Sequence, residues 1–163
     1  MIVVLMGVSG CGKTTIGRLL GKRLGWAFID ADDFHPPANV AKMAAGVPLE
    51  DADRWPWLER LNAELRRREA RGHRAVLACS ALKQAYRDRL AAGLARFELV
   101  YLRASAELLR ARLADRTHRY MPASLLDSQL ATLEPPVRAI EIDAAQSPER
   151  CVETAVAALS ETP

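Results

Sequence analysis

The sequence predicts an α/β fold, in which a single domain over residues 1–163 holds a five-stranded parallel sheet flanked by helices. Short apolar segments alternate with segments of helical periodicity along the whole chain, which is typical of parallel sheets with right-handed crossovers. The length of 163 residues suits one domain with a core large enough to fold unaided. In addition, a glycine-rich loop lies between the first apolar segment and the first helical one, an order typical of nucleotide-binding members of this class.

Strands are expected where the chain has short, mostly apolar runs. The first run, Ile-Val-Val-Leu-Met at residues 2–6, is apolar throughout and should lie in the buried centre of the sheet. Further strands are expected at residues 27–30, 75–79, 97–102 and 139–142.

Helices are expected where apolar residues recur every three or four positions. Ser105 and Ser147 are suited to begin helices, and Gly46 and Gly72 are suited to end them. The expected helices cover residues 14–24, 37–45, 54–71, 83–92, 106–115, 122–133 and 148–159.

Charge and cysteine content exclude several classes of protein. Lys and Arg number 23 and Asp and Glu number 20, so the net charge of +3 is too small to indicate a nucleic-acid-binding protein. No apolar run reaches the ~20 residues that span a bilayer, and the apolar N-terminus is short and lacks a basic leader. Three cysteines without a CxxC pair favour neither a disulfide framework nor a structural zinc site. We therefore expect a cytoplasmic protein that binds neither nucleic acid nor a membrane.

Residues 7–14, Gly-Val-Ser-Gly-Cys-Gly-Lys-Thr, match the phosphate-binding motif GxxxxGK[ST] at every fixed position. The glycines let the backbone approach phosphate oxygens, and the N-terminus of the following helix adds partial positive charge. Lys13 should reach the β- and γ-phosphates of ATP, and Thr14 should ligate Mg²⁺. The motif indicates a nucleoside triphosphate but leaves the reaction open. The residues expected to bind the nucleotide are Gly7, Val8, Ser9, Gly10, Cys11, Gly12, Lys13, Thr14 and Thr15.

The position of the acidic residues narrows the class of P-loop protein. The chain has no NKxD motif for guanine, and its third strand ends in Cys79 and Ser80 rather than in the acidic residue typical of motor and AAA-type ATPases. Asp30, Asp32 and Asp33 instead follow the second strand, at the sheet edge where the phosphate loop lies. One carboxylate there can hold the water shell of Mg²⁺ while another accepts a hydrogen bond from a substrate hydroxyl. The alternative is that Asp32 and Asp33 only cap the next segment.

Several linked motifs resemble the gluconokinase family, in particular the small bacterial enzymes built on the nucleoside-monophosphate-kinase and shikimate-kinase fold. The resemblance covers about residues 3–156 and depends on motifs beyond the phosphate loop. These are Asp-Ala-Asp-Asp-Phe-His-Pro at residues 30–36, Asp-Arg-Trp-Pro-Trp-Leu at 53–58, Cys-Ser-Ala-Leu-Lys at 79–83, Tyr-Arg-Asp at 86–88 and Ser-Gln at 128–129.

The resemblance implies ATP-dependent phosphorylation of D-gluconate to 6-phospho-D-gluconate, with Mg²⁺ as the second cofactor. It implies that Asp30 joins Thr14 as a Mg²⁺ ligand and that Asp32 orients or deprotonates the attacking hydroxyl. Arg54 is the implied partner of the gluconate carboxylate, because arginine suits such a group. Further substrate contacts are expected from Asp32, His35, Lys83, Arg87 and Gln129.

Each substrate contact has a structural alternative. His35 could instead fix its loop by hydrogen bonding, and Arg54 could pair with a neighbouring acidic residue on the surface. Lys83 and Arg87, four residues apart on one helical face, could simply face solvent.

Residues 112–122 resemble the mobile lid of such kinases, whose arginines neutralise charge on the transferring phosphoryl group. Arg116 is the expected lid arginine and, with Lys13 and Asp32, completes the expected catalytic group. The stretch Thr-His-Arg-Tyr at residues 117–120 departs from the Gly-His-Phe-Phe that the family favours. The family also implies a homodimer.

Two other functions stay open at this point. One is another small-metabolite or nucleoside kinase, such as a shikimate kinase, which shares the phosphate loop and lid but needs different substrate motifs. The other is a nucleotide-dependent binding module, which keeps Lys13 and Thr14 but shows no gluconate-stimulated release of ADP.

Overall fold

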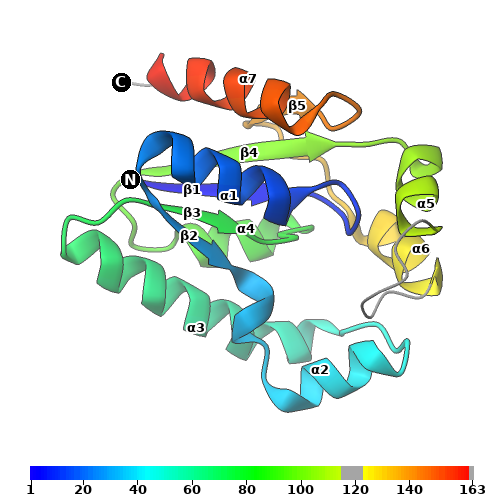
Figure 1. Ribbon diagram of the computed structural model, residues 1–163. Helices are drawn as coiled ribbons and strands as arrows, with labels where there is room; N and C mark the ends of the chain where they lie inside the picture. Colours follow the sequence, from blue (N-terminus) through cyan, green and yellow to red (C-terminus); the bar gives the residue numbers. More distant parts are fainter. Residues whose placement is uncertain (115–122, 162–163) are drawn as a thin grey trace.

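The computed structural model of the chain describes residues 1–114 and 123–161, and it places helices on both faces of a parallel sheet (Figure 1). The strands lie in the order β2-β3-β1-β4-β5, and every adjacent pair is parallel. The predicted five-stranded α/β fold is therefore confirmed. The strands are β1 (Ile2–Met6), β2 (Ala27–Asp30), β3 (Ala75–Ala78), β4 (Phe97–Arg103) and β5 (Ile140–Asp143).

Helices occupy the connections between the strands and follow the last strand. The connection from β2 to β3 is the longest, and it holds the 3-10 helix η1 and the helices α2 and α3. The helical elements are α1 (Lys13–Leu24), η1 (Ala31–Phe34), α2 (Pro37–Ala44), α3 (Asp51–Ala70), α4 (Gln84–Ala91), α5 (Ala106–Ala114), α6 (Ala123–Thr132) and α7 (Pro148–Ser160).

The sheet separates two apolar cores. Leu5 of β1 belongs to the core shared with α1 and α7, together with Leu20 and Ala155. Val4, the preceding residue, belongs to the core on the other face, where Leu61 of α3 packs. This division follows from the alternation of side chains along a strand. A strand buried on both faces has to be apolar at every position, which explains the sequence of β1.

Gly17 sets the distance between α1 and the sheet. A Cβ atom at this position would lie 2.6 Å from Cε2 of Phe28 and 3.1 Å from Cδ1 of Leu5. Only a residue without a side chain fits between the helix and these two apolar side chains. The close packing therefore fixes where the N-terminus of α1 lies relative to the end of β1.

The start of α3 differs from the sequence expectation. The helix begins at Asp51, three residues before the expected start, because Glu50 and Asp53 form a capping box around its first turn. The acidic first turn also interacts favourably with the positive end of the helix dipole. The apolar periodicity used for the prediction starts only later, so it could not reveal this polar turn.

Two further boundaries differ because of side-chain caps. Residues 31–34, expected as a loop, form η1, and the Asp32 amide donates to the carboxylate of Asp30. α4 begins at Gln84 rather than at Lys83, because the carboxylate of Glu134, 50 residues away, accepts a hydrogen bond from the Gln84 amide at 2.6 Å. The other described boundaries lie within one or two residues of those expected.

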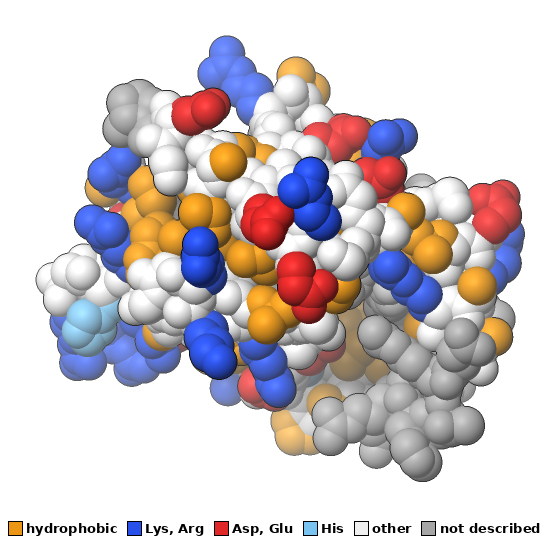
Figure 2. Space-filling view, turned by 45° about the horizontal axis from the view of Figure 1, so that its top comes forward, with side chains coloured by type: hydrophobic (Ala, Val, Ile, Leu, Met, Phe, Trp, Pro, Cys, Tyr) orange, Lys and Arg blue, Asp and Glu red, His pale blue; other side chains and the backbone are white. Residues whose placement is uncertain are grey.

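Basic side chains gather at one end of the face shown in Figure 2, beside a histidine. The last turn of α1 carries Lys22 and Arg23, and the last turn of α3 carries Arg67 and Arg68. Cations at these positions interact favourably with the negative ends of the helix dipoles. The positive charge there accordingly has a stabilising role in the fold. None of the helices in the described part of the chain combines the length and apolar character of a membrane span.

Candidate active site

The phosphate loop joins β1 to α1 at the carboxyl edge of the sheet. Gly7, Gly10 and Gly12 have φ angles of 145°, 89° and 103°, which residues with side chains rarely adopt. Neither a capping side chain nor an acidic first turn compensates the positive N-terminus of α1. Among residues 1–114 and 123–161, the amides of Gly10 and Gly12 find no acceptor. The loop therefore presents donors and partial positive charge that suit a phosphate group.

Lys13 lies over the same loop. Its Nζ atom donates to the carbonyl oxygens of Gly7 and Val8, at 2.8 and 3.1 Å. An ammonium group has three N–H donors, so one donor is left for a phosphate oxygen. The two contacts hold the charge beside the loop, as the motif predicts.

Thr14 and Asp30, the two expected Mg²⁺ ligands, lie together. The Thr14 hydroxyl donates to Oδ2 of Asp30 at 2.9 Å, which joins the first turn of α1 to the end of β2. A hydroxyl and a carboxylate are the oxygen donors that Mg²⁺ prefers, and this ion usually takes only one or two carboxylates and completes its shell with water and phosphate. Accordingly, the described residues contain no cluster of three or more His, Cys, Asp or Glu that could hold a metal. The donors present fit a nucleotide-bound Mg²⁺ ion.

Asp32 lies in η1 and remains accessible, with 85% of its side-chain surface exposed. Its pKa is raised, because surrounding protein removes part of its hydration and the charges of Asp30 and Asp33 repel its own, against an attraction from Lys13. Because most of its side chain is exposed, a substrate can reach this carboxylate. Such a carboxylate is suited to accept a proton from a hydroxyl group.

His35 is fixed within the protein. Its ring stacks on Trp57 with centroids 4.2 Å apart and planes inclined by 15°. Nδ2 of the buried Asn39 donates to the carbonyl of Asp53 and lies 3.3 Å from Nδ1 of His35. Because Asn39 Nδ2 is a donor, Nδ1 of His35 accepts, and the ring proton lies on Nε2. That nitrogen is 3.8 Å from Oδ1 of Asp32.

These contacts favour the structural alternative for His35, because they leave it holding the η1 segment in place. Burial, together with the smaller effect of the positive charge of Arg54, lowers the pKa of His35 to about 4. The ring is therefore neutral at physiological pH. Asn39, which connects this histidine to α3, was not among the expected site residues. The feature that could have identified Asn39 is its polar side chain on the side of α2 that faces the protein interior. In the structure, Asn39 is 3% exposed.

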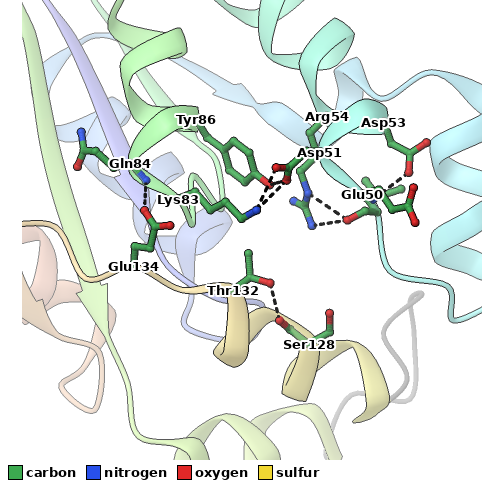
Figure 3. Close-up of polar contacts among 11 residues, drawn as sticks. Glu50, Asp51, Asp53, Arg54, Lys83, Gln84, Tyr86, Ser128, Thr132 and Glu134 are labelled. Atoms are coloured by element: carbon green, nitrogen blue, oxygen red, sulfur yellow. Dashed lines mark hydrogen bonds and ion pairs between the residues drawn. The ribbon is translucent and has the colours of Figure 1, made fainter.

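A second cluster joins the start of α3 to the start of α4 (Figure 3). Nζ of Lys83 lies 2.9 and 3.1 Å from the two carboxylate oxygens of Asp51, and the Tyr86 hydroxyl donates to the same carboxylate. Both contacts, that of Tyr86 first, hold the pKa of Asp51 below its usual range. Ser128 and Thr132 of α6 lie across from this cluster in Figure 3. Asp51 was also not expected as a site residue.

Arg54 completes the cluster. Its guanidinium lies over the Tyr86 ring, 5.4 Å from the centroid, and Nε and Nη2 donate to the carbonyl of Leu49 at 3.3 Å. These contacts are with a ring and a carbonyl oxygen, and within the described residues the guanidinium forms no ion pair with a carboxylate, although its charge lowers the pKa of Asp51 and Asp53. The structural alternative of an ion pair with a surface acid is therefore not the arrangement found.

The charges of the two halves of the site meet around Cys79, the residue after β3. Burial raises the pKa of this thiol to about 12, and Asp32, Lys13 and Arg54 all act on it electrostatically. The thiol therefore stays protonated.

The structural alternative, in which Lys83 and Arg87 both face solvent on one side of the helix, is not the arrangement found. Arg87 is 3% exposed, and its Nη1 atom donates to the carbonyls of Ala81 and Leu82 at 3.0 Å each. Ala81 has a φ angle of 44°, an unfavourable conformation for a residue with a side chain. Arg87 thus holds a strained loop whose Ser80 carbonyl accepts a hydrogen bond from Gly7. Its contact with substrate stays a prediction, and these bonds favour a positioning role.

Gln129 contacts the phosphate loop. Its Oε1 atom accepts a hydrogen bond from the Ser9 amide at 2.8 Å, and its Nε2 atom donates to the Ser9 hydroxyl at 3.1 Å. The expected contact of Gln129 with substrate stays a prediction.

The expected lid lies only partly in the described chain. Arg116, the expected catalytic arginine, and residues 117–120 lie outside the described residues. Arg112, at the start of the expected lid, donates to the carbonyl of Cys11 at 3.4 Å and to that of Ala144 at 2.7 Å. Arg112 therefore connects α5 to the phosphate loop and to the segment after β5.

The comparisons with known proteins agree with this geometry. A protein-family model described as an AAA domain matches residues 2–136, although β3 ends without the acidic residue associated above with AAA-type ATPases. A gluconokinase of Gluconobacter oxydans is 53% identical over 134 residues, which cover 82% of this chain and 75% of that protein. A sugar kinase from Janibacter sp. has a TM-score of 0.93 and 44% identity over 99% of this chain and 95% of its own. A gluconokinase from Sinorhizobium meliloti has a TM-score of 0.87 and 42% identity over 97% of this chain and 90% of its own.

The neutral His35 predicts a pH dependence of stability. Because its pKa falls from 6.5 to about 4 on folding, the unfolded chain takes up a proton in this range that the folded protein excludes. The contribution of the neutral His35 to the free energy of unfolding is thus complete above pH 6.5, and it is lost as the pH falls toward 4. Between about pH 7 and about pH 4.5, the wild type should lose about 2 kcal/mol more unfolding free energy than His35→Gln.

Urea unfolding at the two pH values measures this difference. His73→Gln, which replaces an exposed histidine before β3, is the control and should follow the wild type. Equal losses in the wild type and in His35→Gln would contradict the assignment of a neutral, buried ring.

Proposed function

The chain belongs to the gluconokinase family, and we propose that Asp32, Arg54 and Lys83 hold D-gluconate so that its 6-hydroxyl attacks the γ-phosphate of ATP. The protein is accordingly an ATP-dependent kinase whose product is 6-phospho-D-gluconate. One observation supports the assignment of residues. The phosphate loop, the Thr14–Asp30 pair and the accessible Asp32 follow the carboxyl ends of β1 and β2, and Lys83, which contacts the start of α3, follows the carboxyl end of β3.

On the nucleotide side, the chain supplies fixed charge and donors. The amides of the phosphate loop and the N-terminus of α1 face the phosphates, and Lys13 adds a full positive charge. Thr14 and Asp30 would hold Mg²⁺, which when bound would neutralise charge on the phosphates. Because these groups are in place before ATP binds, they stabilise the transition state without reorganisation.

On the acceptor side, the cations select an acid. Arg54 and Lys83 offer donors for the carboxylate of gluconate, and charge-assisted bonds of this kind are the strong ones. Asp51 and Tyr86 hold Lys83, while the Tyr86 ring supports Arg54. If the carboxylate is held there, the 6-hydroxyl at the other end of the substrate can extend toward Asp32 and the phosphate loop.

The transfer step forms one bond and breaks one. The 6-oxygen of gluconate forms a bond to the γ-phosphorus, and the bond from that phosphorus to the bridging oxygen of ADP breaks. The proton of the 6-hydroxyl passes to the Asp32 carboxylate, and ADP leaves with the electron pair of the broken bond. Positioning and electrostatics supply most of the acceleration in phosphoryl transfer, and the base contributes a further part.

A panel of acceptors tests the function. ADP release, followed with a coupled enzyme assay, should be fastest with gluconate and should give 6-phosphogluconate. Shikimate, nucleosides and the neutral sugar glucose should react at about a tenth of that rate or less, because each lacks the carboxylate or the hydroxyl at the required spacing. Faster turnover with any of them would assign the protein to another kinase class.

Asp32→Asn tests the base. The variant keeps size and polarity but loses the proton acceptor, so kcat should fall by about 10²–10⁴-fold while the affinity for ATP changes little. Asp33→Asn is the matched control, because it removes an equal charge from the next residue of η1 and should retain most of the activity. Preserved kcat in Asp32→Asn with a higher Mg²⁺ requirement would show that Asp32, and not Asp30, holds the metal.

Arg54→Ala tests the carboxylate contact. Loss of a charge-assisted bond worth about 1.5–3 kcal/mol should raise the KM for gluconate by about 10- to 100-fold and leave the KM for ATP nearly unchanged. Arg60→Ala, an exposed arginine on the same helix, serves as the control. An unchanged KM for gluconate would show that Arg54 does not bind the carboxylate and has only a structural role, packing over Tyr86.

A further inference from the structure

Gln129 and Ser9 form a reciprocal pair across 120 residues of sequence. The Ser9 amide donates to Oε1 of Gln129 at 2.8 Å, and Nε2 of Gln129 donates to Oγ of Ser9 at 3.1 Å. Gln129 lies in α6, whereas Ser9 lies in the phosphate loop between Val8 and Gly10. Both residues are half-buried, so these hydrogen bonds are partly shielded from solvent.

The geometry determines the direction of both hydrogen bonds. A backbone amide can only donate, so the carboxamide atom facing it has to be the oxygen. The nitrogen of Gln129 is then the atom that faces the Ser9 hydroxyl, and it can only donate. The hydroxyl therefore accepts from Gln129, and its own hydrogen is directed elsewhere. Within the described residues, that hydroxyl donates no hydrogen bond.

We infer that Gln129 is a positioning residue for the phosphate loop, and that it orients the Ser9 hydroxyl as a hydrogen-bond donor to the terminal phosphate of ATP. The Ser9 amide is already bonded to Gln129, so the hydroxyl is the donor that Ser9 has left. The Lys13 ammonium, which serves the same phosphates, bonds the carbonyl of Val8, the residue before Ser9. An anionic phosphate oxygen is the acceptor that this environment favours.

This role differs from the substrate contact expected for Gln129 from the sequence. A carboxamide whose oxygen and nitrogen are both bonded to Ser9 has one N–H left for a further partner. The inference rests on the ATP-dependent activity above, but it concerns the nucleotide and makes no use of gluconate. It can therefore be tested on ATP binding alone.

The experiment compares the affinities of ATP and ADP in the absence of gluconate, by titration calorimetry. Gln129→Ala and Ser9→Ala should each weaken ATP by about 10- to 100-fold and ADP by less than about 3-fold, because ADP lacks the terminal phosphate. The double variant should lose no more than either single one, since Gln129 acts through Ser9. The KM for gluconate should change by less than about 2-fold in all of them.

Two further variants sharpen the result. Gln129→Glu keeps the shape, but its carboxylate accepts the Ser9 O–H and turns it away, so ATP should bind at least as weakly as in Gln129→Ala. Asp127→Asn, at an exposed position of the same helix, should bind both nucleotides like the wild type. Additive losses in the double variant, equal weakening of ATP and ADP, or a raised KM for gluconate with intact ATP binding would each overturn the inference. If the wild type released no ADP in response to gluconate, the proposed function would be refuted. The comparison of ATP and ADP affinities would still test the role of Gln129.

Discussion

The backbone of the phosphate loop has to be rigid while several of its amides stay unbonded, and the rest of the site is arranged around this requirement. Lys13 fixes the loop through the carbonyls of Gly7 and Val8, and Arg112 reaches the carbonyl of Cys11. Gln129 fixes the Ser9 amide from α6. Side chains from three parts of the chain thus hold the loop, chiefly through its carbonyl groups. The amides of Gly10 and Gly12 stay available, and a preorganised donor set of this kind is what phosphoryl transfer needs.

The carboxylates of the site differ in how they are paired. Asp30 meets Thr14 beside the phosphate loop, and Asp51 meets Lys83 at the acceptor end. Within residues 1–114 and 123–161, the carboxylate of Asp32 accepts no such hydrogen bond, and it remains accessible with a raised pKa. The neutral His35 beside it adds no positive charge. A fully charged histidine there would stabilise the anionic carboxylate and make it a weaker base.

The sequence predicted most of the fold because its signals are local. An apolar run buried on both faces and a glycine-rich motif followed by a helix determine β1, the phosphate loop and the places of Lys13 and Thr14. Asp30 was predictable as well, since the carboxyl ends of parallel strands meet at one edge. Gln129 and Arg87 were harder, because residue type indicates the chemistry of a side chain and not its partner. Their partners, Ser9 and the carbonyls of a strained loop, depend on how distant segments pack. Asn39 and Asp51 were missed for the same reason.

The long connection between β2 and β3 has a consequence for how such a protein can change. Residues 31–70 supply Asp32, His35 and Arg54, whereas the phosphate loop and its supports come from other segments. On the proposed assignment, two of the three acceptor residues, Asp32 and Arg54, come from this continuous stretch, and the third, Lys83, precedes α4. The groups proposed for the nucleotide lie elsewhere in the chain. Substitutions in the β2–β3 connection can therefore change the fit of the acceptor while leaving the residues of the phosphate loop unchanged.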